Sequence, residues 1–217
     1  MAQKTAVLLD FDGTIMDTNQ AIINSWHATF RELEGRDGDE DVILATFGET
    51  LEDSMRHMFP DVPVERSRGI YRDYQAKHLM NQIDLFPGSR ELLDTLADRG
   101  IRMGLATSRL KATTMQALET FDLNRYFECV ITADDITKHK PDPQIAYISM
   151  ERLGVSPEET LMMGDTMYDV LCARNAGITS VLAGWSLSLG GKSMQDFAPG
   201  EAPDYILQNP MELLGLL

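Results

Sequence analysis

The sequence predicts an α/β fold in which helices cover both faces of a parallel sheet, with a second, all-helical domain inserted near the N-terminus. Three observations support this prediction. An apolar run over residues 6–9 ends in two aspartates. From residue 89 onward, short apolar runs alternate with amphipathic helical patterns, which is typical of a parallel sheet with helical crossovers. Between residues 15 and 85, only helical patterns occur.

The predicted core is Rossmann-like, with a helix between successive strands. After the first strand it resumes at Phe86-Pro87-Gly88, a turn signal. Gly100 follows a helical pattern and is expected to end that helix. We expect further strands over 101–106, 127–132, 160–165 and 178–183 and near the C-terminus, and helices over 89–99, from 109 to about 121, over 144–154 and up to 176.

The inserted block is expected to form a helical cap over residues 15–86, so that the core consists of residues 1–14 and 87–217. One amphipathic helix is predicted from Asp17 or Thr18 to about Leu33. Two shorter helices are expected over 39–46 and 50–59, and a longer one over 63–82. Glycine and proline in the links at 13–18 and 83–88 make these links candidate hinges.

Composition limits the classes of partner. The 217 residues include 19 Lys and Arg against 34 Asp and Glu, which gives a net charge of −15 and disfavours nucleic acid and anionic membranes. No apolar run is long enough to span a bilayer and no signal-peptide pattern is present, so we expect a cytoplasmic protein. The oligomeric state is left open between a monomer and a homodimer, since the cap could dimerise. Cys129 and Cys172 lack metal-binding spacing and are expected to be buried small hydrophobes.

Polar side chains follow four of the predicted strands. The carboxyl ends of parallel strands lie at one edge of a sheet, where open α/β folds bind their ligands. Residues far apart in the sequence are therefore expected to meet in one cleft. These residues are, in strand order, Asp10 and Asp12, Thr107 and Ser108, Lys140 in the loop after the third strand, and Asp165 with Asp169 one helical turn further on.

These residue types suit phosphoryl transfer. Asp10 could attack phosphorus and form an aspartyl-phosphate, while Asp12 could donate and then recover a proton. Because carboxylates and a phosphate repel one another, we expect a divalent cation held by Asp10 and Asp165, and oxygen ligands favour Mg²⁺. Lys140 would neutralise developing charge and restrain Asp10.

Several of these positions have two interpretations. The hydroxyls of Thr107 and Ser108 can hold phosphate oxygens, but Thr107 can also cap the next helix. Asp165 can likewise cap a helix as well as bind a metal. Asp169 can orient a ligand of the metal without binding the metal itself, or it can be an exposed helix residue. A merely solvated Lys140 is disfavoured, because the prolines at 141 and 143 fix its loop.

The motifs Asp-Phe-Asp-Gly-Thr, Thr-Ser, Lys-Pro-Asp-Pro and Gly-Asp-Thr-Met-Tyr-Asp resemble, in this order, the four motifs of the haloacid dehalogenase superfamily. The insert after the first motif resembles the C1 cap of that superfamily. Within it, the chain looks most like the phosphoglycolate phosphatase and inorganic pyrophosphatase group. The resemblance implies a phosphatase with Asp10 as nucleophile, Asp12 as acid and base, and Mg²⁺ bound by the Asp10 side chain, the Asp12 carbonyl and Asp165.

Two positions depart from the pattern of that superfamily. His139 stands where many relatives have glycine, and Arg109 stands where they often have lysine. Arg109 can reach the substrate or start a helix. In the cap, Gly48 and its neighbour Glu49 are the candidates for substrate contact. Trp185 can line the cleft or pack in the core.

The resemblance leaves several reactions open. An inorganic pyrophosphatase or a β-phosphoglucomutase-like phosphotransferase would use the same fold and the same acidic residues. A 2-haloacid dehalogenase would attack carbon with Asp10 and would need neither Asp12 nor a metal. A non-catalytic phosphoryl-binding module would not require the whole set of Asp10, Asp12, Lys140 and Asp165. The expected function is hydrolysis of a small phosphorylated metabolite, such as a phosphoglycolate-like phosphomonoester.

Overall fold

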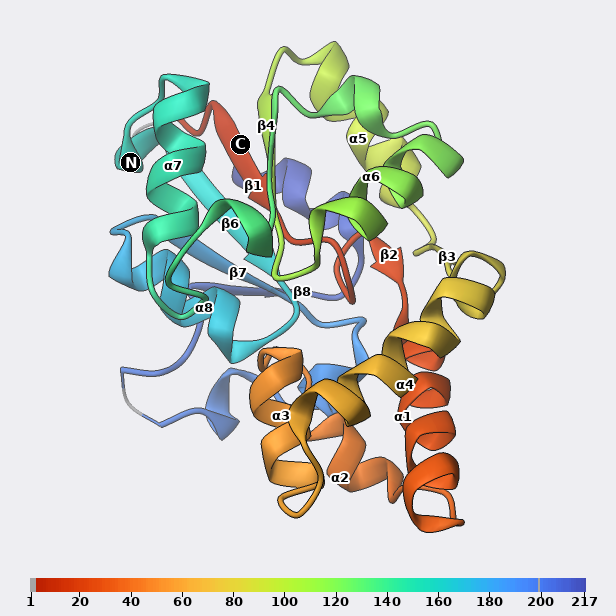
Figure 1. The fold of residues 1–217 in the computed structure, drawn as a ribbon. Coiled ribbons are helices and arrows are strands. Elements are labelled where there is room, and N and C mark those ends of the chain that lie inside the picture. The colour runs from red at the N-terminus through yellow and green to blue at the C-terminus, as the bar shows by residue number, and fades with distance from the viewer. Residues whose placement is uncertain (1–2, 199) are drawn as a thin grey trace. The chain divides into compact units, whose positions relative to one another are not determined.

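The structure is a computed structural model that describes residues 3–198 and 200–217 (Figure 1). The chain divides into two compact units. One comprises the chain up to Met16 together with the residues from Leu85 onward, and the other comprises Asp17–Asp84.

The first unit contains a six-stranded parallel sheet, as predicted, in the order β5-β4-β1-β6-β7-β8. Strand β1 is central and pairs on both sides, so that Leu8 lies opposite Gly104 of β4 and Met162 of β6. Every residue of β1 is fully buried, which explains its uninterrupted apolar sequence. The strands are β1 (Ala6–Leu9), β4 (Arg102–Ala106), β5 (Cys129–Ile131), β6 (Thr160–Gly164), β7 (Thr179–Ala183) and β8 (Tyr205–Leu207).

Helices cover the sheet on both faces, as the sequence predicts. Leu8 packs in a buried cluster with the apolar residues of α7 (Gln144–Leu153) and α8 (Met167–Asn175). Helix α5 (Ser89–Asp98) packs beside β4 and buries its leucines, while α6 (Lys111–Thr120) follows β4 in the chain (Figure 1). The 3₁₀ helix Pro210–Leu216 ends the chain against α5.

The second unit is built from α1 (Asn19–Glu34), α2 (Glu40–Leu44), α3 (Leu51–Met58) and α4 (Val64–His78), followed by the 3₁₀ turn Leu79–Asn81. Aromatic rings form its core. The Trp26 ring centroid lies 5.3 Å from that of Tyr71, and the Phe30 ring centroid lies 4.6 Å from that of Phe59. Gly35 ends α1 with a φ of +70°, a conformation that glycine adopts without strain.

Two short strands mark the ends of the inserted block. Strands β2 (Met16–Asp17) and β3 (Asp84–Leu85) form a two-stranded sheet where the chain leaves and re-enters the first unit. They add to the purely helical expectation for residues 15–86. A strand of two residues is too short to show an alternating pattern, so sequence periodicity does not reveal it.

Neither cysteine forms a disulfide, and both thiols are buried, as expected. Burial raises the pKa of Cys129 to about 11 and that of Cys172 to about 12. Over the residues that the structure describes, no helix combines the length and the apolar character that crossing a membrane requires.

Candidate active site

The site is built on the carboxyl ends of β1 and β6, which are neighbours in the sheet. Asp10 directly follows β1, and its N–H donates to the carbonyl of Met163 at 2.9 Å, so it extends the pairing of the two strands. Asp165 directly follows β6, and Asp169 lies in the first turn of α8. The parallel topology thus places the first and fourth predicted strand ends side by side.

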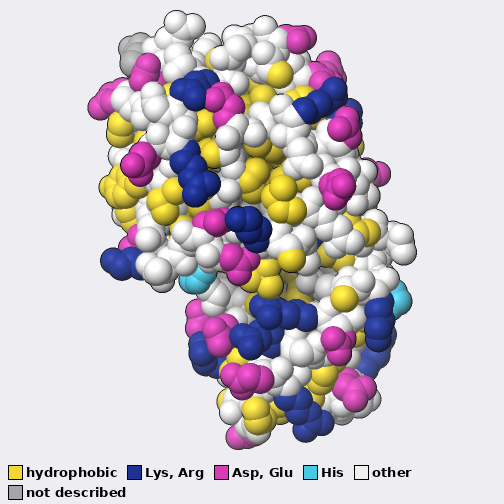
Figure 2. Space-filling model, turned by 45° about the horizontal axis from the view of Figure 1, so that its top comes forward, with side chains coloured by type: hydrophobic (Ala, Val, Ile, Leu, Met, Phe, Trp, Pro, Cys, Tyr) yellow, Lys and Arg dark blue, Asp and Glu magenta, His cyan; other side chains and the backbone are white. Residues whose placement is uncertain are grey.

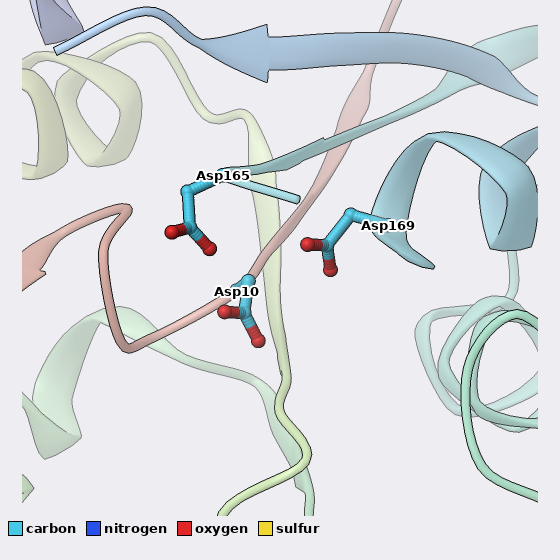
Figure 3. A group of neighbouring side chains, drawn as sticks. All are labelled: Asp10, Asp165 and Asp169. Carbon is cyan, nitrogen blue, oxygen red and sulfur yellow. The ribbon is translucent and has the colours of Figure 1, made fainter. Parts of the chain in front are cut away.

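Three carboxylates meet at this edge (Figure 3). Oxygens of Asp10, Asp165 and Asp169 all lie within 4.8 Å of one another, and the three residues are 7%, 5% and 3% exposed. Figure 3 shows the three side chains close together, coming from the end of β1, the end of β6 and the start of α8. An exposed Asp169, one of the two interpretations of the sequence, is therefore wrong.

Lys140 joins two of these carboxylates. Its Nζ lies 2.8 Å from Oδ1 of Asp10 and 2.6 Å from Oδ1 of Asp169, and the residue is only 6% exposed. Burial alone would lower the pKa of Lys140, but the charges of Asp10 and Asp169 outweigh that effect and raise it. A charged lysine is therefore fixed against Asp10 from a loop 130 residues away.

The negative charge of the site exceeds what Lys140 compensates. Burial raises the pKa of Asp10 well above its usual range, although Lys140 opposes this, and the charges of Asp169 and Asp165 add to it. Burial and the charge of Asp169 raise the pKa of Asp165 to about 7. Three buried carboxylates, of which Lys140 contacts only two, offer oxygen ligands that fit a hard divalent cation such as Mg²⁺.

Two glycines permit this crowding. A Cβ atom on Gly13 would lie 2.1 Å from Oδ2 of Asp165, and one on Gly164 would lie 2.1 Å from Cγ of Asp169. Gly13 also has a φ of +70°, which favours glycine. The glycines of Asp-Gly-Thr and Gly-Asp are therefore needed because carboxylates occupy the space where their side chains would be.

Asp169 has a second function as a helix cap. Its Oδ2 accepts hydrogen bonds from the N–H and the hydroxyl of Thr166, the N-cap residue of α8, at 3.1 and 2.8 Å. The helix thereby fixes the carboxylate whose other oxygen contacts Lys140. Because Thr166 is the N-cap, the alternative interpretation of Asp165 as the cap is wrong.

Asp12 lies outside the group of three carboxylates and pairs with Arg109. Nη1 of Arg109 lies 2.9 Å from Oδ1 of Asp12, and the two side chains are 8% and 25% exposed. The guanidinium also lies over the ring of Phe11, 5.7 Å from its centroid. Helix α6 begins at Lys111, so Arg109 does not start it. The second aspartate of the motif is thus held by the arginine that departs from the superfamily pattern.

Thr107 is buried, and its hydroxyl accepts the N–H of Arg109 at 3.2 Å. Helix α6 has Leu110 as its N-cap, so the interpretation of Thr107 as a helix cap is wrong. Ser108 is exposed next to it. Gly48 belongs to the second unit and lies in a turn with a φ of +89°.

Sequence reasoning missed two serines at the site. The hydroxyls of Ser186 and Ser188 both donate to Oδ2 of Asp165, at 2.7 and 2.5 Å. Trp185, just before them, donates its indole N–H to the carbonyl of Thr14 at 3.0 Å. The available signal is that this loop follows β7, whose carboxyl end lies at the same edge as those of β1 and β6.

Comparisons with known proteins agree with this geometry. The family described as haloacid dehalogenase-like hydrolase matches residues 7–183. A relative from Halalkalibacterium halodurans, named pyrophosphatase PpaX, is 31% identical over 97% of this chain and 95% of its own length. Another protein of that name, from Oceanobacillus iheyensis, is 28% identical over 97% of this chain and 95% of its own length.

Solved structures share the fold over the whole chain. A haloacid dehalogenase-like family hydrolase from Streptococcus pneumoniae is 24% identical, with a TM-score of 0.83 and 99% coverage of both chains. A structure described as a predicted phosphoglycolate phosphatase from Haemophilus somnus is 18% identical, with a TM-score of 0.83 and coverage of 99% and 98%. At these identities the likeness concerns the fold.

Proposed function

The chain belongs to the haloacid dehalogenase-like hydrolase family, and on that premise we propose that it is a Mg²⁺-dependent phosphatase of a small phosphorylated metabolite. The observation that carries the proposal is the buried group of Asp10, Asp165 and Asp169, with Lys140 paired to Asp10 and Asp169. A carboxylate restrained by a lysine and crowded by two further carboxylates suits an attack on phosphorus beside a divalent cation.

Asp10 is the proposed nucleophile. Lys140 holds its Oδ1, so Oδ2 is the oxygen that would attack. In the first step a bond forms from Oδ2 to phosphorus while the bond from phosphorus to the leaving oxygen breaks, and Asp12 gives that oxygen a proton. In the second step a water oxygen attacks phosphorus, Asp12 takes the water's proton, and the Asp10 carboxylate is released together with phosphate.

The proposed metal ligands are the side chains of Asp10 and Asp165 and the main-chain carbonyl of Asp12. Asp169 would fix Lys140 and orient the ligands of the metal, and it is close enough to Asp10 and Asp165 to serve as a ligand itself. When bound, Mg²⁺ offsets the charge of the carboxylates and of the phosphoryl group.

The substrate contacts remain proposals from the sequence, with support from position. Thr107 and Ser108 lie at the end of β4, next to β1, and would hold phosphate oxygens. Arg109 adjoins them and would contact an anionic substrate. The helical unit is the proposed cap, over residues 15–86, with the core formed by 1–14 and 87–217. Gly48 is its proposed contact residue.

Two substrates have specific support. The name of the relative that is 31% identical favours inorganic pyrophosphate. A phosphoglycolate-like phosphomonoester is favoured by the resemblance of the motifs and by the name of a structural neighbour, whose 18% identity carries only the fold. A mutase reaction would require the intermediate to be shielded from water. We further propose that the enzyme acts as a monomer or homodimer in the cytoplasm, where reduced thiols such as Cys129 and Cys172 are usual.

The test of the reaction is phosphate release by the Asp10→Asn variant. Losing the attacking carboxylate should reduce turnover by about 10³-fold or more, as for other catalytic nucleophiles. EDTA should abolish the activity of the wild-type enzyme and added Mg²⁺ should restore it. The control is Asp122→Asn, because Asp122 is exposed and distant from the site in sequence. Full activity of Asp10→Asn, or activity that survives EDTA, would exclude this mechanism.

The substrate is tested by measuring kcat/KM for pyrophosphate, phosphoglycolate and a panel of sugar phosphates. We expect pyrophosphate or a small phosphomonoester to exceed the other compounds by at least about 10-fold, the discrimination that one good polar contact gives. Isomerisation of a sugar phosphate without release of phosphate would favour the mutase reaction instead.

A further inference from the structure

The loop after β7 contacts Asp165 at one oxygen only. Ser186 and Ser188 both donate to Oδ2, at 2.7 and 2.5 Å. Within the described chain, no hydrogen bond of the structure involves Oδ1. The carboxylate thus presents Oδ2 to the loop, and one of its oxygens lies within 4.8 Å of an oxygen of Asp10. Figure 3 shows the side chains of Asp165 and Asp10 next to each other.

The loop is held on both sides of the two serines. Before them, the Gly184 N–H donates to the carbonyl of Leu207 at 2.7 Å, and the Trp185 indole donates to the carbonyl of Thr14 at 3.0 Å. The Trp185 ring also contacts Phe86, with centroids 6.4 Å apart. After them, Leu189 is 5% exposed in an apolar cluster with α8 and β7. The serine hydroxyls are therefore placed by packing that does not involve Asp165.

We propose that Ser186 and Ser188 are positioning residues that set the affinity of this site for its divalent cation. By fixing Oδ2, they restrain rotation of the Asp165 carboxylate and so also fix the position of its Oδ1. Hydrogen-bond partners of metal ligands typically contribute about 10- to 100-fold in metal affinity. The proposal rests on the proposed function, because it assumes that Asp10 and Asp165 bind the cation.

A competing explanation is that the hydroxyls only stabilise the loop. Ser186 also accepts the N–H of Ser188 at 3.3 Å, as the N-cap of the short 3₁₀ turn Leu187–Leu189. A purely structural role would lower the melting temperature of the protein without changing its affinity for the cation. The two roles are therefore separated by measuring cation binding and stability on the same variants.

The experiment measures Mn²⁺ binding to the whole chain, without substrate, by electron paramagnetic resonance of the free ion. The variants are Ser186→Ala, Ser188→Ala and the double variant. Ser193→Ala is the matched control, because that hydroxyl lies in the same segment of the chain and bonds to Asp196 on the surface. Ser188→Thr keeps the donor and tests for rescue. Thermal unfolding confirms that each variant is folded.

We expect the Kd for Mn²⁺ to rise about 10-fold or more in the double variant, to change less than about twofold in Ser193→Ala, and to return toward the wild-type value in Ser188→Thr. An unchanged Kd in a folded double variant would overturn the positioning role and leave the proposed function intact. If the wild-type chain bound no Mn²⁺, the metal assignment itself would fail, and this inference with it. Should the double variant not fold, the comparison of Ser188→Ala with Ser188→Thr decides the question.

Discussion

Lys140 is a buried charge, and the two carboxylates that it contacts offset the cost of burying it. It is buried between Asp10 and Asp169, and its charge offsets only part of theirs. Removing one member of a buried ion pair leaves the other charge without compensation, which is far more costly than the pair itself is stabilising. The same lysine that restrains the nucleophile therefore also holds the site together in the absence of a cation.

Replacing Lys140 with Ala should lower the free energy of unfolding by about 3 kcal/mol, because two buried carboxylates lose their counterion. Urea denaturation in EDTA measures this. Lys138→Ala is the control, since Lys138 is exposed in the same loop and its Nζ lies 3.7 Å from a carboxylate oxygen of Asp142, a weak ion pair. This substitution should change the free energy of unfolding by less than about 0.5 kcal/mol. Equal stabilities of the two variants would contradict the account.

At the level of residues, the sequence predicts what depends on topology and misses what depends on loop conformation. Asp10 and Asp165 follow adjacent parallel strands, so their meeting follows from the fold. The contact of Arg109 with Asp12, and of Ser186 with Asp165, depends on how irregular loops are held by distant groups. No periodicity encodes such contacts, because each of them is set by packing elsewhere in the unit.

At the level of elements, the turn after β1 and the end of β6 approach so closely that a side chain would prevent it. Gly13 and Gly35 have the same φ of +70°, but their surroundings differ. A Cβ atom on Gly35 would meet nothing within 4 Å, whereas one on Gly13 would collide with Asp165. Comparing alanine variants at Gly35 and Gly13 therefore separates the backbone strain of an alanine at positive φ from the steric cost of a side chain that collides with Asp165.

We expect Gly35→Ala to destabilise the protein by about 1 kcal/mol through backbone strain alone. Gly13→Ala should cost clearly more, and it should also weaken Mn²⁺ binding, because Asp165 must move. Urea denaturation and Mn²⁺ titration of both variants test this. Equal losses of stability with unchanged Mn²⁺ binding would show that Asp165 adjusts without cost.

The order and the approximate ends of the helices and strands of the core follow from the sequence, since apolar runs alternate with helical segments and several of these segments have a terminating residue. Gly100 and Gly154, for instance, have positive φ at the ends of α5 and α7. Strands β2 and β3 escape prediction because pairing between distant chain segments, not local sequence, defines a two-residue strand.

At the level of the whole molecule, the net charge is −15. On the face drawn in Figure 2, acidic and basic side chains are interspersed. Long-range electrostatics would therefore repel an anionic substrate, and attraction must come from groups at the site itself, such as Lys140 and Arg109. The net charge also makes the stability of the chain sensitive to pH. Among the residues that titrate in alkali, the two buried thiols lower the stability of the folded protein as the pH rises.

Cys129 and Cys172 should make the protein less stable above pH 9. Burial raises their pKa values from an ordinary 9.0 to about 11 and about 12. Between these values the folded chain keeps protons that the unfolded chain has lost, so raising the pH favours unfolding. The stabilising effect is complete below pH 9 and is lost as the pH rises toward the folded pKa values. From pH 8 to pH 10, each thiol should lower the free energy of unfolding by about 1 kcal/mol.

Urea denaturation at pH 8, 9 and 10 tests this with the wild-type chain and with Cys129→Ala and Cys172→Ala, alone and combined. The alanine variants lose stability at every pH, because a buried side chain is truncated, but their stability should fall less steeply with pH. The double variant should retain only the dependence due to other groups. Lys140 adds little to it in this range, because its raised pKa contributes stability that is lost only above a pH of about 10.4. Parallel curves for the wild type and the double variant would show that the thiols ionise in the folded protein as readily as in the unfolded chain, which their burial beside the sheet opposes.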